Sequence, residues 1–179
     1  VIMSGQTRDR NTMKQATAYA ETGHLCLSTL HANNANQAME RVINFFPEEA
    51  HRQLLVDLSL NLAGVVSQRL IPGLHEKLVP AVEVMLNSSY ISDLIAKGEF
   101  SGIKEAMARS TEIGMCTFDQ ALYQLYTEDR ISLDEALHNA DSRTDLALRI
   151  RLAAGVSTQD AGDLSIDTSS PIQSAARLA

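Results

Sequence analysis

The fold of this chain is decided by residues 22–35, which read TGHLCLSTLHANNA. A short apolar run ends abruptly there in a histidine and two amides, as expected of a buried strand that leaves a sheet. In open sheets of parallel strands, ligands bind outside the carboxyl ends of the strands. His31 is expected at that end, and it is therefore the best single candidate for a functional residue.

The residues before this stretch predict a strand, a helix and a return strand. In order, the segments are a strand (1–4), a polar turn (5–11), a helix that begins with a capping box at Thr12 and ends at Gly23, and a strand (24–30). Strands joined by a crossover helix run parallel. Gln6 and His31 are therefore expected to emerge at the same edge of the sheet.

The residues after this stretch predict two helices and a further pair of strands. Apolar residues at helical spacing indicate one helix from Asn34 and another from Pro47 to Gly64. Two stretches rich in β-branched residues, 65–71 and 79–86, flank a proline-glycine turn and predict antiparallel strands. We expect these strands to belong to the same sheet as the first two.

The remainder of the chain predicts short amphipathic helices and then a tail. Thr117 and Ser132 each begin a capping-box pattern, and Leu133 is expected to turn inward together with Ala136. Beyond about Ala154 the residues are mostly Ser, Thr, Asp, Gly and Ala, which bury too little apolar area to offset the entropy of ordering. We expect a disordered tail there.

Composition narrows the classes of function. The chain has 179 residues, 45% of them hydrophobic, a net charge of -7 and a pI near 5.2. Its basic residues are not clustered and tryptophan is absent, which disfavours a nucleic-acid partner. No apolar run reaches the roughly 18 residues that span a bilayer, so we expect a soluble, cytoplasmic protein. Because residue 1 is Val rather than Met, we also expect a fragment whose amino-terminal part is missing.

The expected sheet edge limits the chemistry available. In nucleotide-hydrolysing sheets this place carries carboxylates that hold Mg²⁺ or polarise the attacking water. Gln6 can hydrogen-bond a water but cannot accept its proton, and Asp9 can do so only if the turn brings it back over the sheet. The alternative is that Arg8 and Asp9 form an ion pair that stabilises the turn.

The histidines and cysteines indicate no metal site. His24 and His31 are an odd number of residues apart, so on a regular strand their side chains point to opposite faces. The other histidines have no partner at ligand spacing, and Cys26 and Cys116 are expected to be reduced thiols within apolar stretches. For His31, the alternative to a functional role is a simple hydrogen bond to nearby backbone.

Several stretches support a resemblance to a known family. They are GQTRDRNTM (5–13), AETGHL (20–25), STLHANNA (28–35), RVINFFP (41–47), LAGVVSQRLIP (62–72), EVM (83–85) and GMCTFDQAL (114–122). Together they closely resemble the type IV pilus retraction ATPases of the PilT/PilU family, especially its PilU branch, over roughly residues 1–150. The resemblance implies an α/β fold: the carboxyl-terminal half of a RecA-like P-loop NTPase domain (1–87), a small helical subdomain (88–152) and a disordered tail (153–179).

The same resemblance implies a hexameric motor that holds ATP between subunits, hydrolyses it with Mg²⁺, and drives pilus retraction and twitching motility. The residues that it places at the nucleotide are Gln6 and His31 as catalytic groups, and Gly5, Arg8, Asp9, His24 and Thr29 as nucleotide-binding groups. The implied partners are further copies of the chain, a paralogous retraction ATPase and the inner-membrane platform protein of the pilus. The motor would be cytoplasmic and peripheral to that membrane.

Two departures from the family pattern bear on activity. The family has glutamate where this chain has Gln6, and no G-x-x-x-x-G-K-[ST] motif occurs in the sequence. The phosphate-binding loop is thus expected upstream of Val1, and this chain by itself should bind ATP weakly or not at all. One alternative is a non-hydrolysing motor subunit, which Gln6 favours. The other is a related type II secretion or pilus assembly ATPase, which predicts a cysteine-rich zinc insertion that this sequence lacks.

Overall fold

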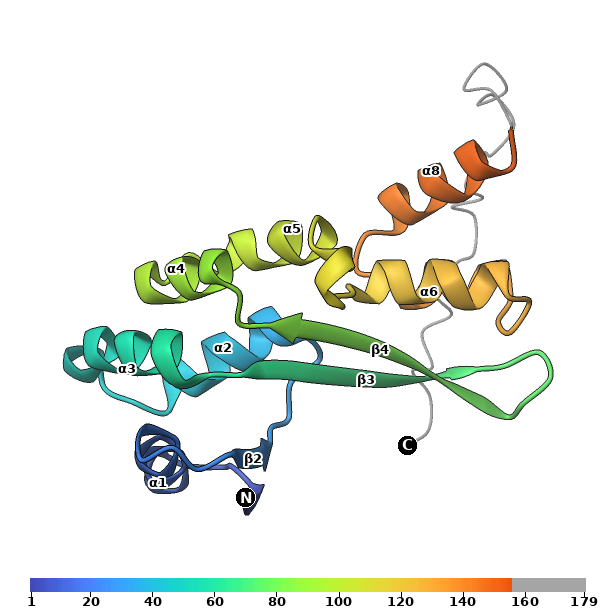
Figure 1. Ribbon diagram of the computed structural model, residues 1–179. Helices are drawn as coiled ribbons and strands as arrows, with labels where there is room; N and C mark the ends of the chain where they lie inside the picture. The colour runs from blue at the N-terminus through green and yellow to red at the C-terminus, as the bar shows by residue number, and fades with distance from the viewer. Residues whose placement is uncertain (156–179) are drawn as a thin grey trace, which may run out of the picture.

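The amino-terminal residues form the predicted strand–helix–strand unit in the computed structural model, which describes residues 1–155 (Figure 1). Its elements are strand β1 (Ile2–Gln6), helix α1 (Arg10–Glu21) and strand β2 (Cys26–Thr29). The two strands pair in parallel, with Ile2 opposite Cys26 and Gln6 opposite Thr29. The parallel arrangement is confirmed, although β1 ends later than predicted and β2 is shorter at both ends.

Helix α1 begins earlier than its sequence pattern indicates. Asp9 has an extended backbone (φ -148°, ψ 167°), and its Oδ1 accepts the N–H of Thr12 at 2.9 Å. The predicted capping box at Thr12 is therefore wrong, because the aspartate in front of it already satisfies an N–H group of the first turn. At the other end, Gly23 follows the helix with a φ of 82°, the left-handed conformation that favours glycine.

Two helices follow β2 as predicted. Helix α2 spans Ala35–Asn44 and is capped by the side chain of Asn34, and helix α3 spans Glu48–Asn61 directly after Pro47. The buried residues of α2 are Ala35, Ala38, Met39 and Val42. Their helical spacing gives α2 one apolar face, which packs into the molecule.

Strands β3 (Gly64–Pro72) and β4 (Leu78–Leu86) form the predicted antiparallel hairpin. They do not join β1 and β2, so the prediction of one common sheet is wrong: within residues 1–155 each pair is a separate two-stranded sheet. Helix α2 packs against both hairpin strands. The hairpin and the β1–β2 pair lie in different layers of the molecule (Figure 1).

The remaining helices are α4 (Ser89–Lys97), α5 (Ile103–Ala108), α6 (Phe118–Thr127), α7 (Leu133–Asn139) and α8 (Arg143–Ala153). Thr117 and Gln120 make the complete capping box predicted for α6. None of the described helices has both the length and the apolar character that a membrane span needs. The predicted tail, from residue 156 onward, lies outside the described residues.

Only one of the two hydrogen bonds of the predicted capping box forms at helix α7. Ser132 accepts the N–H of Glu135, but the Glu135 carboxylate binds the side chain of Asn139 instead of returning to the cap. Leu133 is 40% exposed, so its predicted inward orientation is wrong, whereas Ala136 is fully buried. Leu133 is the first residue of the helix, where its side chain lies outside the packed face.

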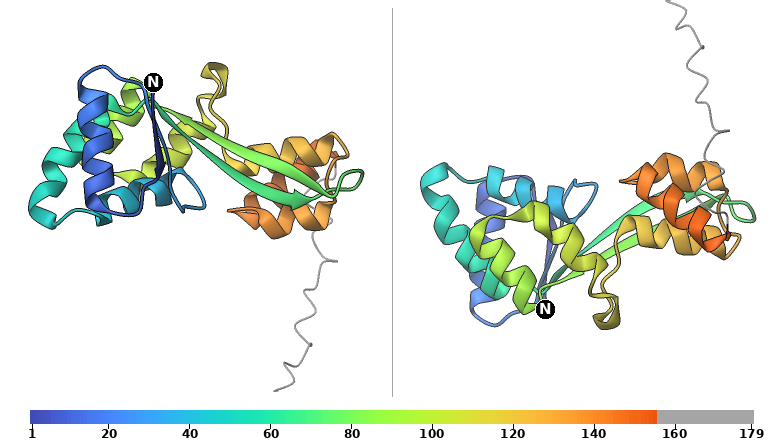
Figure 2. Two further views of the ribbon diagram at one scale, coloured as in Figure 1. Left: turned by 90° about the horizontal axis from the view of Figure 1, so that it is seen from below. Right: turned by 90° about the horizontal axis from the view of Figure 1, so that it is seen from above.

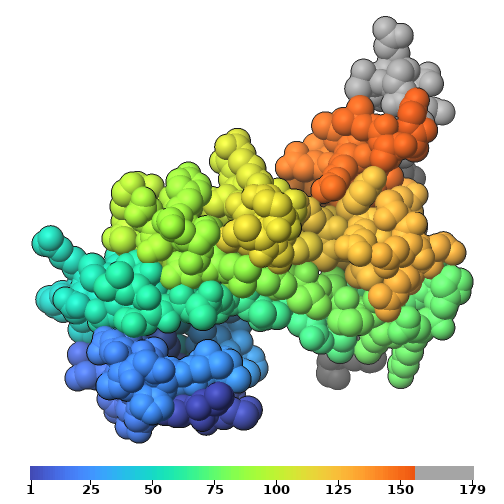
Figure 3. All heavy atoms as spheres, in the orientation of Figure 1, coloured from blue at the N-terminus to red at the C-terminus, as the bar shows by residue number. Residues whose placement is uncertain are grey.

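Two hydrophobic cores lie along the hairpin, whose length is seen from below and above in Figure 2. Met85 packs in the first core with residues of α2, α3, α4 and α5. Ile71, Val79 and Ala81 pack in the second core with residues of α6, α7 and α8. The space-filling view shows two lobes joined along the hairpin, with the amino-terminal unit projecting beneath the first lobe (Figure 3). The domain division after residue 87 stays a prediction.

Candidate functional site

The carboxyl ends of β1 and β2 bring several of the predicted site residues to one edge. Gln6 lies opposite Thr29 in the parallel register, and the N–H of Thr7 donates to the Thr29 carbonyl at 2.9 Å. His31 follows Thr29 by two residues, beyond the end of β2. Gln6 and Thr29 are therefore neighbours at the rim of this small sheet, and His31 lies in the loop that leaves it.

Polar side chains tie the two strands together just below the rim. The Ser28 hydroxyl donates to the Gly5 carbonyl at 3.2 Å and also contacts the hydroxyl of Thr7. Thr7 is only 2% exposed. A Cβ added at Gly5 would meet nothing within 4 Å, so packing among the described residues does not require a glycine there.

Gln6 is oriented by Arg8. The Arg8 Nε donates to Gln6 Oε1 at 2.7 Å. An amide held in this way can donate to or accept from a water, but it cannot remove the proton of that water as a carboxylate does. With Gln6, this rim can position a water and supplies no general base at position 6.

Asp9 is committed to α1 rather than to the rim. Its Oδ1 accepts the N–H of Thr12, and its Oδ2 accepts the Thr12 hydroxyl at 3.1 Å. The hydrogen bond from the Thr12 backbone lowers the pKa of the Asp9 carboxyl. The alternative of an ion pair between Arg8 and Asp9 is wrong for residues 1–155, since Arg8 turns to Gln6 and Asp9 to Thr12.

The two histidines of the segment lie at opposite ends of β2. His24 precedes the strand, and its Nδ1 lies 3.0 Å from the Thr22 hydroxyl while its ring meets Tyr19 edge-on. His31 follows the strand and is exposed, and within the described residues its ring makes no hydrogen bond. The structure therefore does not bring His24 to the rim, and it leaves the His31 ring available to a ligand.

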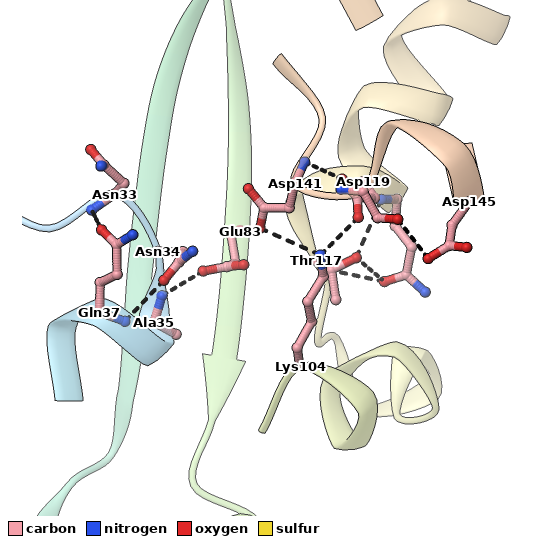
Figure 4. A network of polar contacts seen from close by, with 12 residues as sticks. Asn33, Asn34, Ala35, Gln37, Glu83, Lys104, Thr117, Asp119, Asp141 and Asp145 are labelled. Atoms are coloured by element: carbon pink, nitrogen blue, oxygen red, sulfur yellow. Dashed lines mark hydrogen bonds and ion pairs between the residues drawn. The ribbon is translucent and has the colours of Figure 1, made fainter. Parts of the chain in front are cut away.

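The loop between β2 and α2 is anchored from the hairpin. Glu83 of β4 is 3% exposed, and its Oε1 accepts the N–H of Ala35 at 2.7 Å (Figure 4). Burial raises the pKa of the Glu83 carboxyl, and the hydrogen bond from Ala35 offsets part of the rise. Arg69 of β3 reaches the same loop, where its Nη2 donates to the carbonyl of Asn33 at 3.2 Å.

Sequence reasoning missed Arg69 and Glu83, although a signal for them exists. Glu83 occupies an inward position of β4 between the buried Ala81 and Met85, and Arg69 occupies the corresponding parity of β3, two residues before the buried Ile71. A charged residue at a core position of a strand needs a hydrogen-bonding partner. A charged residue on the inward-facing side of each strand is therefore a sequence signal for a structural or functional role.

Residues 1–155 do not fit a magnesium site. No group of three or more His, Cys, Asp and Glu residues able to hold a metal occurs within residues 1–155. Both carboxylate oxygens of Asp9 are occupied by Thr12, and Gln6 offers a neutral amide. Mg²⁺ prefers carboxylate and phosphate oxygens, so its ligands would have to come from outside the residues described.

Comparisons with known proteins show the family to which this chain belongs. The model of the family described as "Type II/IV secretion system protein" matches residues 1–149. The chain belongs to this family. The chain is 57% identical to the type IV pilus ATPase PilU of Pseudomonas aeruginosa over 166 residues. These aligned residues are 92% of this chain and 43% of PilU.

Other members of the secretion system family give the same result. The pilus retraction ATPase PilT of P. aeruginosa is 34% identical over 140 residues, which are 78% of this chain and 41% of PilT. A crystal structure of the pilus retraction motor PilT with bound ADP matches with a TM-score of 0.72 and 31% identity, covering 82% of this chain and 41% of that one. The PilT/PilU resemblance and the RecA-like fold class are thus confirmed. The chain spans less than half of the length of these relatives.

Proposed function

We propose that this chain is the carboxyl-terminal part of an ATP-hydrolysing motor subunit that powers type IV pilus retraction and twitching motility. The observation that carries the proposal is the 57% identity to a type IV pilus ATPase over 92% of the chain. The rim geometry agrees with it, because Gln6 and Thr29 pair in register at the carboxyl edge and His31 follows them. Ligands of open α/β sheets bind at that edge.

In the proposed site, this chain supplies one wall of an ATP pocket and another segment supplies the phosphate-binding loop. The His31 imidazole would contact the γ-phosphate, and Gln6 would orient the attacking water through its amide. Gly5, Arg8 and Thr29 would line the nucleotide beside them. Asp9 would act indirectly, since its carboxylate fixes the start of α1 directly after the Gln6–Arg8 pair.

A second candidate is a motor subunit that binds ATP without hydrolysing it. The observation that favours it is Gln6, whose amide takes the place of the carboxylate expected at this position and is held by Arg8 at 2.7 Å. General-base catalysis contributes roughly 10²- to 10⁴-fold to a rate. A subunit without the base would thus serve as a structural partner of a hydrolysing one.

The proposed motor is a homohexamer with ATP and Mg²⁺ held between subunits. It would assemble alone or with a paralogous retraction ATPase on the inner-membrane platform protein of the pilus. We place it in the cytoplasm, peripheral to the inner membrane. What supports this assignment is the likeness to PilU and PilT, and it concerns the whole motor subunit rather than the described residues alone.

The test is a chimera in which this chain replaces the matching part of P. aeruginosa PilU. We expect the chimera to hydrolyse ATP and the His31→Ala variant to be slower by roughly 100-fold, the usual cost of removing one group that stabilises the transition state. The measurement is steady-state phosphate release. His138→Ala changes an exposed histidine of α7 and serves as the matched control.

The same chimera separates the two candidates. If it binds ATP without turnover and Gln6→Glu restores hydrolysis, the chain belongs to a non-hydrolysing subunit. Equal turnover of the His31→Ala variant and the unaltered chimera would contradict the role given to His31. A chimera that folds but neither binds nor hydrolyses ATP with either residue at position 6 would contradict the proposed function.

A further inference from the structure

Glu83 fixes the first turn of α2 from the hairpin. Its Oε1 accepts the N–H of Ala35 at 2.7 Å, and the residue is 3% exposed. The N–H groups of a first helical turn have no partner within the helix. The Asn34 side chain, next to the helix in the sequence, accepts the N–H of Gln37. The N–H of Ala35 is instead accepted by Glu83, which belongs to the hairpin (Figure 4).

Arg69 holds the same loop and the helical part of the chain at once. Its Nε and Nη2 donate to the Asn33 carbonyl at 3.3 and 3.2 Å. Its Nη1 donates to the carbonyl of Asn139 at 2.9 Å, and its Nη2 pairs with Asp141 Oδ1 at 2.7 Å. The guanidinium carbon lies 3.9 Å from the ring centroid of Phe118. One side chain therefore joins the loop after β2 to the connection between α7 and α8.

The connection between α7 and α8 is itself held on two sides. Asp119 Oδ1 accepts the N–H of Asp141 at 2.8 Å. Lys104 Nζ lies 2.8 Å from Asp119 Oδ2 and 3.5 Å from Asp141 Oδ2, and both aspartate side chains are 17% exposed. Figure 4 shows these contacts beside those of Glu83 with the loop. A shift of Asp141 would therefore act on Arg69, and through Arg69 on Asn33.

We propose that Arg69 and Glu83 are positioning residues that fix the loop carrying His31 to the hairpin and couple it, through Asp141, to the helical subdomain. The proposal rests on the function proposed above. Packing alone does not explain the pair, since an apolar residue at position 83 would avoid the cost of burying a carboxylate. What an apolar residue cannot do is hold the backbone of residues 33–35.

The first arm of the test uses this chain alone and measures amide hydrogen exchange. In Glu83→Leu, the N–H of Ala35 loses its acceptor, and we expect its exchange to accelerate roughly 10- to 100-fold, as the usual strength of hydrogen bonds to charged groups implies. Glu83→Gln keeps an oxygen acceptor, so the N–H of Ala35 should still exchange slowly in that variant. Glu76→Leu removes an exposed carboxylate at the tip of the hairpin and should leave Ala35 unchanged.

The second arm uses the PilU chimera and measures kcat and KM for ATP. Arg69→Met keeps an unbranched side chain at position 69 and removes the guanidinium, with its donors to the Asn33 carbonyl. We expect kcat to fall roughly 10- to 100-fold with little change in KM, because displacing a group that acts in the transition state lowers kcat. Arg130→Met breaks a comparable pair with Glu76, away from the loop, and should leave both constants unchanged.

The outcomes separate this proposal from the function on which it rests. Unchanged exchange of Ala35 in Glu83→Leu, or equal kcat values for Arg69→Met and Arg130→Met, would overturn the positioning roles. A chimera that folds but neither binds nor hydrolyses ATP would overturn the proposed function instead, and a His31→Ala variant as fast as the unaltered chimera would overturn only the role given to His31. The exchange arm contains no ATP, so it would still decide whether the hairpin holds the loop.

Discussion

The amino-terminal unit (residues 1–34) and the hairpin with its helices (residues 35–153) differ in where their apolar side chains lie. Within the described chain, Ala16 is the only hydrophobic residue of the amino-terminal unit that is buried. Met3 is 82% exposed, and Leu27, which pairs with it, is 48% exposed. The buried members of both hydrophobic cores all come from the hairpin and its helices.

This difference means that the proposed rim site and the two hydrophobic cores lie in separate parts of the described chain. The rim residues Gln6, Thr29 and His31 belong to a unit with few buried contacts, a property of segments that open at low free-energy cost. Its Met13 and Leu30 pack against the first core and α1 contacts α3, while Arg69 and Glu83 bind the loop that leads into α2. The comparison predicts that substitutions in the two regions affect different measurements.

The largest expected effect is on the second core. Phe118→Ala removes a fully buried ring and the surface on which Arg69 rests, and it should lower the free energy of unfolding by about 3–5 kcal/mol. Leu27→Ala, in the amino-terminal unit, should change it by only about 0.5 kcal/mol. Urea denaturation of both variants checks the contrast. Equal losses would break the distinction between the two regions.

A smaller effect is expected at Asp119, which joins segments that are far apart in the sequence. Asp119→Ala removes the partner of Lys104 and the acceptor for the N–H of Asp141. Hydrogen bonds to charged groups contribute about 1.5–3 kcal/mol each, and we expect a loss in that range for the whole variant because solvent relaxes into the site. The urea midpoint measures it.

The matched variant for Asp119 lies in the amino-terminal unit. Asp9→Ala removes a carboxylate that bonds only within its own helix, to Thr12. We expect faster amide exchange in the first turn of α1 with a nearly unchanged urea midpoint. A fall of the midpoint as large as that of Asp119→Ala would show that the two regions unfold as one cooperative unit.

Local patterns predicted much of this fold because the interactions behind them are local. The crossover between β1 and β2 forces them parallel, the proline-glycine turn closes the hairpin, and Thr117 forms its capping box with a residue three positions away. The rim follows from the same topology, since parallel strands end at the same edge. Gln6 and His31 could therefore be selected before any coordinates.

The errors concern choices among competing partners. Asp9 and Thr12 are both good caps, and the earlier one prevails because it adds another turn of hydrogen bonds to α1. Alternation along β3 and β4 shows which face is buried, but it carries no information on which layer the hairpin joins. The contacts of Arg69 with Asn33 and Asp141 span 36 and 72 positions in the sequence, beyond the reach of any local pattern.

The smallest expected effect is on the pH dependence of stability, which should have opposite signs for Glu83 in the hairpin and Asp9 in the amino-terminal unit. Burial raises the folded pKa of Glu83 above the ordinary glutamate value of 4.5, so the native state binds more protons than the unfolded state between the two pKa values. Stability from this group therefore falls as the pH rises from about 4.5 through the folded pKa. The hydrogen bond from Thr12 lowers the folded pKa of Asp9 below 3.8, so its contribution is present above 3.8 and is lost as the pH falls through the folded value.

Two variants isolate these contributions by difference. Glu83→Gln keeps an acceptor for the N–H of Ala35 without a titrating proton, and subtracting its urea-derived stability from that of the unaltered chain should leave a curve that falls with rising pH above about 4.5. Asp9→Asn keeps a capping oxygen without the charge, and its difference curve should fall with decreasing pH below 3.8. Because Asp9 acts within α1 alone, its curve should be resolved in the amide exchange of that helix more clearly than in the urea midpoint. Difference curves of the same sign would mean that Glu83 gains more from its contact with Ala35 than it loses by burial, and the loop would then be held by a net favourable charge.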